Sequence, residues 1–228
     1  MGSNYTSNYN VDIVMCIDAT GSMRSLIEMV KRNAMQFGRD LRTMMERGDS
    51  ESDPKYIDQL RVRVIAFRDY LADGDKAMLM TDFFTLPEQS EDFSELMEEI
   101  HADGGGDDPE DGLEALGYAI RETDWVRSGE RRRHIIVVWS DEGTHEIGFG
   151  KEAPNYPKNM AKSFAELSSW WEMMEGNAKR LILFTPDKSG WTEIDRNWEN
   201  TLFYKSEAGK GLEEYSYQAI LSAIKYSV

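Results

Sequence analysis

Cysteine is nearly absent from this chain, since Cys16 is the only one among 228 residues. A single thiol excludes an internal disulfide, and scarce cysteine is typical of proteins in a reducing compartment. Cys16 lies inside the apolar run at residues 11–17, where we expect it to be buried as a small hydrophobic side chain. The sequence therefore predicts a cytoplasmic protein without covalent cross-links.

Basic residues are also in short supply. Lys and Arg number 26 against 42 Asp and Glu, which gives a formal net charge of -16 and a pI near 4.6. Proteins that bind phosphate backbones rely on a basic face. The compact basic block at residues 131–133 stands directly before an apolar run, where we expect it to flank a strand in solvent. We therefore expect no nucleic acid among the partners.

Long apolar runs and linkers are missing as well. No apolar run approaches the roughly 20 residues that cross a bilayer, and no basic stretch followed by an apolar core begins the sequence. We therefore expect neither membrane anchoring nor export. No Pro- or Ser-rich linker divides the chain, which predicts one domain at residues 11–228 after a disordered lead-in or expression scar at residues 1–10.

Short apolar runs alternate with amphipathic stretches along the remaining chain. The connection between the runs at 60–67 and 78–84 is too short for a parallel crossover, so we expect this pair to be antiparallel. The alternation predicts a doubly wound α/β fold. Strands are expected at residues 11–17, 60–67, 78–84, 134–140, 180–185 and 202–204, and helices at 22–46, 93–100, 112–125, 164–171 and 212–224.

Acids and hydroxyls gather where apolar runs end. The first run ends in Asp18-Ala19-Thr20-Gly21-Ser22, the run at 134–140 ends in Asp141-Glu142, and a glycine-rich turn at 104–111 carries further acids. Carboxylate and hydroxyl oxygens suit hard cations such as Mg2+, and α/β folds bind ligands at the carboxyl ends of strands. In the alternative interpretation, Asp18 is a turn residue and Ser22 an ordinary helix N-cap.

These three turns, in this order, resemble the von Willebrand factor A (vWA) domain over nearly the whole chain. That family has a metal-ion-dependent adhesion site (MIDAS) made of a D-x-[ST]-x-S turn, a residue from a second loop and an Asp from a third. The resemblance implies a Rossmann-like sandwich whose mainly parallel six-stranded sheet has one antiparallel edge strand and helices on both faces. It also implies that Mg2+ is bound by Asp18, Thr20, Ser22 and Asp141, and that an acidic side chain of a partner protein completes the shell.

The second loop departs from the most familiar family pattern, because residues 104–111 contain no Thr. They resemble the D-x-P-E variant of integrin β-type domains, which implies Glu110 as a metal ligand and Asp107 beside a neighbouring ion. The extra acid would also suit Ca2+ or Mn2+. The alternative is a good helix start without metal, with Asp108 as N-cap and Pro109 at the first helical position.

His145 follows the third turn. A His among carboxylates can bind metal, but a single His without a second one is weak evidence for such a site. We therefore expect His145 to make a simple hydrogen bond or to contact a partner.

The function that the resemblance implies is a divalent-cation-dependent protein interaction module, and we expect no enzymatic activity. One alternative is a Mg2+-dependent phosphotransferase or phosphatase with Asp18 as nucleophile, because D-x-T-G-[ST] also occurs in P-type ATPases and related haloacid-dehalogenase-like enzymes. Another is a metal-independent scaffold. Among vWA proteins, the motifs look most like bacterial intracellular members, which resemble adaptors in stress-response and conflict modules, including tellurium-resistance-type modules.

Overall fold

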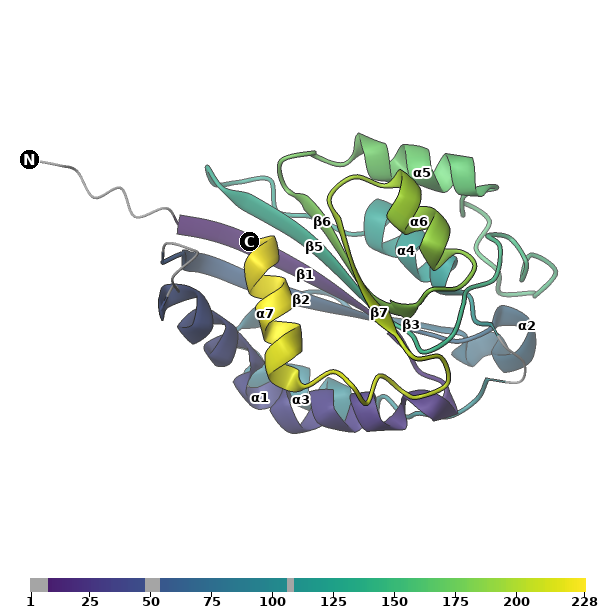
Figure 1. Cartoon of the computed structure of the whole chain (residues 1–228), viewed down its shortest axis with the longest axis horizontal. Coiled ribbons are helices and arrows are strands. Elements are labelled where there is room, and N and C mark those ends of the chain that lie inside the picture. The colour runs from purple at the N-terminus through teal and green to yellow at the C-terminus, as the bar shows by residue number, and fades with distance from the viewer. Residues whose placement is uncertain (1–7, 48–53, 106–108) are drawn as a thin grey trace, which may run out of the picture.

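A twisted central sheet with helices on both faces forms the protein (Figure 1). The computed structural model describes residues 8–47, 54–105 and 109–228. The strand order is β3-β2-β1-β5-β6-β7, and β4 also pairs with β2. The strands are β1 (Asn8–Asp18), β2 (Tyr56–Phe67), β3 (Met78–Met80), β4 (Phe84–Leu86), β5 (Arg132–Trp139), β6 (Lys179–Pro186) and β7 (Thr201–Ser206).

The sheet is parallel except at one edge, as predicted. β2, β1, β5, β6 and β7 pair in parallel, whereas β3 and β4 both pair with β2 antiparallel. The expected strand at 78–84 is therefore two short strands that share one edge position. Thr81 causes the interruption, because its hydroxyl oxygen accepts a hydrogen bond from the backbone N of Val64 at 3.0 Å, where a strand would supply a carbonyl.

Helices cover both faces because β1 and its neighbours are apolar on both sides. Ile13 and Met15 face the core beneath α1, α3 and α7, whereas Val14 and Cys16 face the core beneath α4, α5 and α6 (Figure 1). Cys16 is buried, as expected. The helices are α1 (Arg24–Arg47), α2 (Tyr70–Asp73), α3 (Ser90–Glu99), α4 (Gly112–Arg121), α5 (Phe164–Met173), α6 (Trp191–Asn197) and α7 (Tyr217–Ser227), with 3-10 helices at Gly21–Met23 and Gly74–Lys76.

Several element boundaries differ from those predicted. β1 begins at Asn8, before the expected start at residue 11, because Asn8 already pairs with Tyr56 of β2. The last helix begins at Tyr217 and not at residue 212, because Leu212 has a φ of 57°, which a right-handed helix cannot contain. α2 and α6 were not predicted, because their 4 and 7 residues are too short for a periodic apolar pattern.

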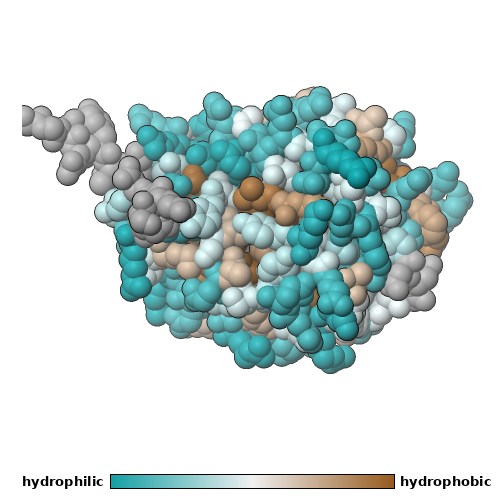
Figure 2. Space-filling model, viewed as in Figure 1, coloured by the Kyte–Doolittle hydropathy of each residue, from teal (hydrophilic) through white to brown (hydrophobic). Residues whose placement is uncertain are grey.

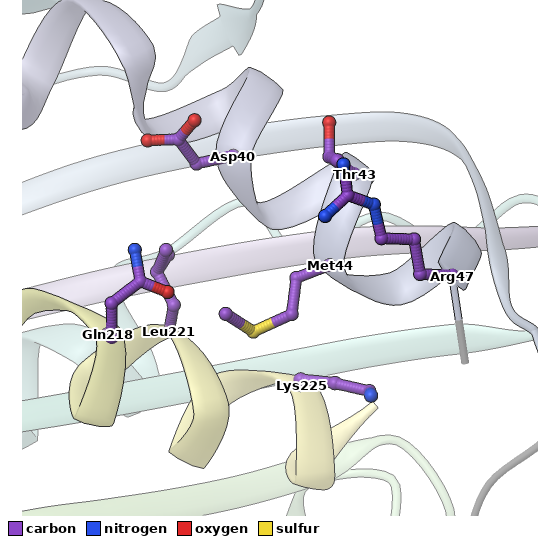
Figure 3. A pocket seen from close by; sticks show the side chains of 7 residues that line it. All are labelled: Asp40, Thr43, Met44, Arg47, Gln218, Leu221 and Lys225. Carbon is purple, nitrogen blue, oxygen red and sulfur yellow. The ribbon is translucent and has the colours of Figure 1, made fainter. Parts of the chain in front are cut away.

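The face seen in Figure 2 is mostly hydrophilic, with small and separate hydrophobic areas. In the described residues, no helix has the length and apolar character needed to cross a bilayer. A shallow groove runs between α1 and α7, and its charged side chains Asp40, Arg47 and Lys225 do not converge on one point (Figure 3). This groove therefore lacks the convergent polar groups that fix a ligand.

The segment between β5 and α5, residues 140–163, is irregular, and it covers part of α4. It buries Glu114 completely, and the Oε1 atom of this residue accepts hydrogen bonds from Gly148 N and the Tyr156 hydroxyl, both at 2.8 Å. Burial above all, and then the charge of Asp111, raise the pKa of Glu114 to about 7.

Glu114→Gln is expected to stabilise the protein at pH 8 but not at pH 5. The folded-state pKa of about 7 exceeds the ordinary 4.5, so the stability linked to this proton is fully present below pH 4.5 and is lost as the pH rises through 7. At pH 8 the loss amounts to roughly 3 kcal/mol, which the neutral amide avoids. Urea unfolding in chelator at both pH values measures the difference, with Glu122→Gln at the exposed end of α4 as control. An equal effect of Glu114→Gln at both pH values would contradict this linkage.

Candidate metal centre

The predicted site residues that the structure describes meet at one edge of the sheet. Asp18 at the end of β1 aligns with Phe67 at the end of β2, and Ile17 aligns with Trp139 at the end of β5. The carboxyl ends of three parallel strands therefore lie side by side. The chain leaves β1 toward β2 on one side and returns to β5 on the other, so this edge is a topological switch point, where open α/β sheets bind ligands.

Asp18 lies at the centre of this edge and is fully buried. Its Oδ1 accepts hydrogen bonds from Thr20 N at 3.0 Å and from Thr20 Oγ1 at 2.6 Å, and its Oδ2 accepts one from Ser140 Oγ at 2.8 Å. Burial raises the pKa of Asp18 to about 6, because desolvation outweighs these hydrogen bonds and the charge of Asp141 adds to it.

Ser22 and Asp141 join the same cluster from two different loops. Ser22 Oγ donates to Asp141 Oδ1 at 2.8 Å and lies 3.5 Å from Thr20 Oγ1. A hydroxyl that donates to a carboxylate keeps its lone pairs for a cation. Ser22 is exposed and lies inside a 3-10 helix, so it is not the N-cap of α1, as the alternative interpretation supposed. The cluster therefore opens to solvent at Ser22.

Glu110 comes from the second loop and is nearly fully buried. A Cβ atom at Gly105 would lie 3.1 Å from Glu110 Oε1 and 3.1 Å from Thr20 Cβ. The side chains of Glu110 and Thr20 therefore line the same narrow space beside Gly105. Among the described residues, Glu110 Oε2 finds no hydrogen-bond partner. Burial, and then the charge of Asp18, raise the pKa of Glu110 to about 9. A cation is the natural compensation for such a carboxyl group.

The helix-start alternative does not describe Glu110. α4 begins at Gly112, so Pro109 and Glu110 precede it, and Glu110 instead forms a parallel bridge with Thr144. Thr144 Oγ1 donates to the Glu110 carbonyl at 3.0 Å and holds this loop against the third one. Asp107 and Asp108 lie outside the described residues, so their roles stay predictions.

Three supporting residues were missed by the sequence analysis. Ser140 holds Asp18, and Gly211 donates its N–H to Asp141 Oδ2 at 2.8 Å. Arg68 is buried directly after β2, and its guanidinium donates to the carbonyls of Ala19 and Asp103 at 3.1 and 2.8 Å. Ser140 was detectable from its place at a strand end, but nothing local distinguishes Arg68 or Gly211.

The residues present fit a hard divalent cation. The side chains that converge offer only carboxylate and hydroxyl oxygens, which are the preferred ligands of Mg2+ and Ca2+. They come from all three loops, and one of them is a buried carboxyl group with an unpartnered oxygen. The converging residues are Asp18, Thr20, Ser22, Glu110 and Asp141.

Comparison with known proteins shows the fold. No family model and no curated protein sequence matches the chain. Two crystal structures of the pilus adhesin SpaC from Lactobacillus rhamnosus GG have TM-scores of 0.50 and 0.52 at 12% identity, and they match 95% and 98% of this chain. The chain spans 30% of the length of SpaC.

Two structures of proximal thread matrix protein 1 from the mussel byssus have TM-scores of 0.48 and 0.46 at 9% and 12% identity. The match covers 96% and 95% of this chain and 46% and 48% of the mussel protein, and the second structure is described as having a zinc-occupied MIDAS motif. At 12% identity the likeness to SpaC concerns the fold alone. Together with the sheet topology, it shows the doubly wound α/β sandwich that the sequence predicts.

Proposed function

We propose that this chain is a vWA-type interaction module that binds a divalent cation and, through it, an acidic side chain of a partner protein. The observation that carries this proposal is the buried Oε2 of Glu110, which has no hydrogen-bond partner among the described residues and lies beside the cluster that contains Asp18. The proposed ligands are Asp18, Thr20, Ser22, Glu110 and Asp141, with Asp107 assisting them or a neighbouring ion. Mg2+ suits these oxygens best, and Mn2+ or Ca2+ can replace it.

A bound cation would supply a point of positive charge to which a carboxylate attaches. Thr20 and Ser22 are neutral hydroxyls, but Asp18, Glu110 and Asp141 can together carry three negative charges against the two positive charges of the cation. A partner carboxylate would therefore attach directly to the cation at an open coordination position, and not to a site of net positive charge. Ser22 is exposed, which gives an incoming side chain access to this end of the site. A partner carboxylate is a charge-assisted ligand that fits such an opening.

One observation favours binding over catalysis. The Asp18 side chain is fully buried. A nucleophilic Asp must be reached by its substrate, whereas a cation is small enough to be bound among buried oxygens. We therefore propose no enzymatic activity and, from the motif resemblance, a cytoplasmic adaptor of a bacterial stress-response or conflict system.

A peptide-capture experiment tests this function. The immobilised protein is expected to capture Asp- or Glu-containing peptides from a random array in Mg2+, to release them in chelator and to recapture them when Mg2+ is restored. Asp18→Asn should reduce capture at least about tenfold, which corresponds to the loss of one charge-assisted contact. Asp195→Asn makes the same chemical change at an exposed position of α6 and should have no effect.

Two results would count against the proposal. Capture that is insensitive to both chelator and Asp18→Asn would favour a metal-independent scaffold. Phosphate incorporation at Asp18 from acetyl phosphate would favour the phosphotransferase.

A further inference from the structure

A second polar cluster is buried next to the candidate MIDAS and shares none of its proposed ligands. Asp69 follows β2, Asp111 precedes α4, and His145 lies in the segment at 140–163. All three side chains are buried, with exposed fractions of 0%, 0% and 8%. His145 Nδ1 lies 3.2 Å from Asp69 Oδ2 and 3.2 Å from Asp111 Oδ1. A simple hydrogen bond or a partner contact was expected for His145, and the structure places its Nδ1 beside two buried carboxylates.

The hydrogen bonds that the described residues make around this cluster leave one carboxylate oxygen without a donor. Asp69 Oδ1 accepts from Ala72 N at 2.6 Å, and Asp111 Oδ2 accepts from Tyr70 N at 2.7 Å. The two remaining carboxylate oxygens both face Nδ1 of His145, which carries at most one proton. Among the described residues, Asp69 Oδ2 has no hydrogen-bond partner, although it is completely buried. One buried carboxylate oxygen is thus left without a hydrogen bond within the described part of the chain, and it needs either a proton, which burial favours by raising the pKa of Asp69, or a cation.

We propose that Asp69, Asp111 and His145 bind a second divalent cation, of the Zn2+ class. The three ligand atoms lie within 4.8 Å of one another, and two of the separations are 3.2 Å. Ligand atoms at Zn2+ bond lengths of roughly 2.0–2.2 Å stand about 3.3–3.6 Å apart in a tetrahedral site, which the two separations of 3.2 Å already approach. An imidazole nitrogen favours Zn2+ over Mg2+, in contrast to the oxygen-only candidate MIDAS.

A groove gives this cluster a route to solvent. It is lined by residues that include Pro109, Thr144, His145 and Phe149. The Phe149 ring stacks on His145 with 3.8 Å between ring centroids and is 48% exposed. A cation can therefore reach His145 without unfolding of the core, which a functional site requires.

The second cation would support the first site from behind. Asp111 follows Glu110 directly, and the backbone N–H of His145 donates to the Glu110 carbonyl at 2.9 Å. A cation held by Asp111 and His145 would fix the chain on both sides of that carbonyl. The zinc site is a proposal in its own right, because none of its ligands depends on Mg2+ binding at Asp18.

Zinc titration in excess Mg2+ tests this site. Chelator-treated, untagged protein is titrated with Zn2+ against a chromophoric chelator. Wild type is expected to bind one Zn2+ per chain, and His145→Gln should weaken this binding by about 100-fold or more, because a direct ligand is lost. His101→Gln changes an exposed histidine and should bind as wild type does. Asp18→Asn should also bind zinc as wild type does. Failure of the zinc proposal can therefore be distinguished from failure of the proposed Mg2+-dependent function.

A second variant and spectroscopic measurements distinguish loss of a zinc ligand in His145→Gln from misfolding of that variant. Asp69→Asn is expected to lose zinc likewise, and Co2+ in wild type is expected to give visible absorption bands that both variants lack, while circular dichroism reports their folding. Zinc binding that survives in folded His145→Gln and Asp69→Asn would overturn the proposal. Loss of zinc binding in Asp18→Asn alone, or no zinc binding by wild type, would also overturn the proposal. In either case the cluster would only hold its loops together by hydrogen bonds.

Discussion

Saturating Mg2+ is expected to raise the thermal unfolding midpoint of the wild-type chain, and Asp18→Asn is expected to abolish the rise. A ligand that binds only the native state at 100 times its Kd stabilises it by about 2.7 kcal/mol. For a chain of this size the shift is roughly 5–10 °C. Asp18 is the buried centre of the cluster and accepts hydrogen bonds from two of its hydroxyls, so no other side chain replaces its carboxylate. Differential scanning calorimetry in chelator and after addition of Mg2+, Mn2+ or Ca2+ measures the shift.

The same comparison separates loss of metal from loss of folding. In chelator, Asp18→Asn should be at least as stable as wild type, because the amide removes a buried charge and keeps an acceptor for Thr20 N. Asp195→Asn should respond to Mg2+ as wild type does. If Mg2+ raised the unfolding midpoint of Asp18→Asn as much as that of wild type, the ion would bind elsewhere. If none of the three ions raised the midpoint of wild type, the acidic turns would serve only to hold the loops together.

Arg68→Met is expected to destabilise the protein by about 3–5 kcal/mol and to weaken Mg2+ binding in the fraction that folds. The guanidinium is buried and makes five hydrogen bonds to the loops around the site. Its Nη atoms donate to the carbonyls of Lys76 and His101 at 3.0 and 2.7 Å. Methionine fills similar space but leaves these acceptors without their donor, including the carbonyl of the fully buried Ala19, which is the costly case for a hydrogen-bond deletion. Urea unfolding with and without Mg2+ measures both effects.

Arg24 offers a matched control for this substitution. Its guanidinium donates to the carbonyl of Ala102 at 3.4 Å, in the loop that Arg68 also holds, but the side chain is exposed. Arg24→Met should therefore change stability by about 0.5 kcal/mol or less. Arg68→Lys keeps the charge but not the planar fork of donors, so it should recover only a small part of the loss. Full recovery by Lys would mean that charge, and not the set of hydrogen bonds, holds the loops.

The fold was largely predictable because its signals are local. The apolar run of β1 and the amphipathic pattern of α1 follow from side chains close together in the chain, and each element must bury its own apolar face. The split edge at Thr81 and the late start of α7 were not predictable in this way. The first depends on a hydroxyl that takes the place of a carbonyl opposite Val64, and the second depends on the backbone conformation of Leu212.

By itself, the sequence determined the chemistry of the first turn, because Asp18, Thr20 and Ser22 lie within five residues and their spacing at a strand end is a local property. Only the tertiary structure decided what surrounds that turn. Parallel pairing of β1 with β2 and β5 brings Arg68 and Ser140 to Asp18, although 50 and 122 positions separate them from it in the chain. The same pairing and the fold of residues 140–163 place His145 between Asp69 and Asp111. Contacts of this kind depend on strand register and loop packing, which residues near in sequence do not encode.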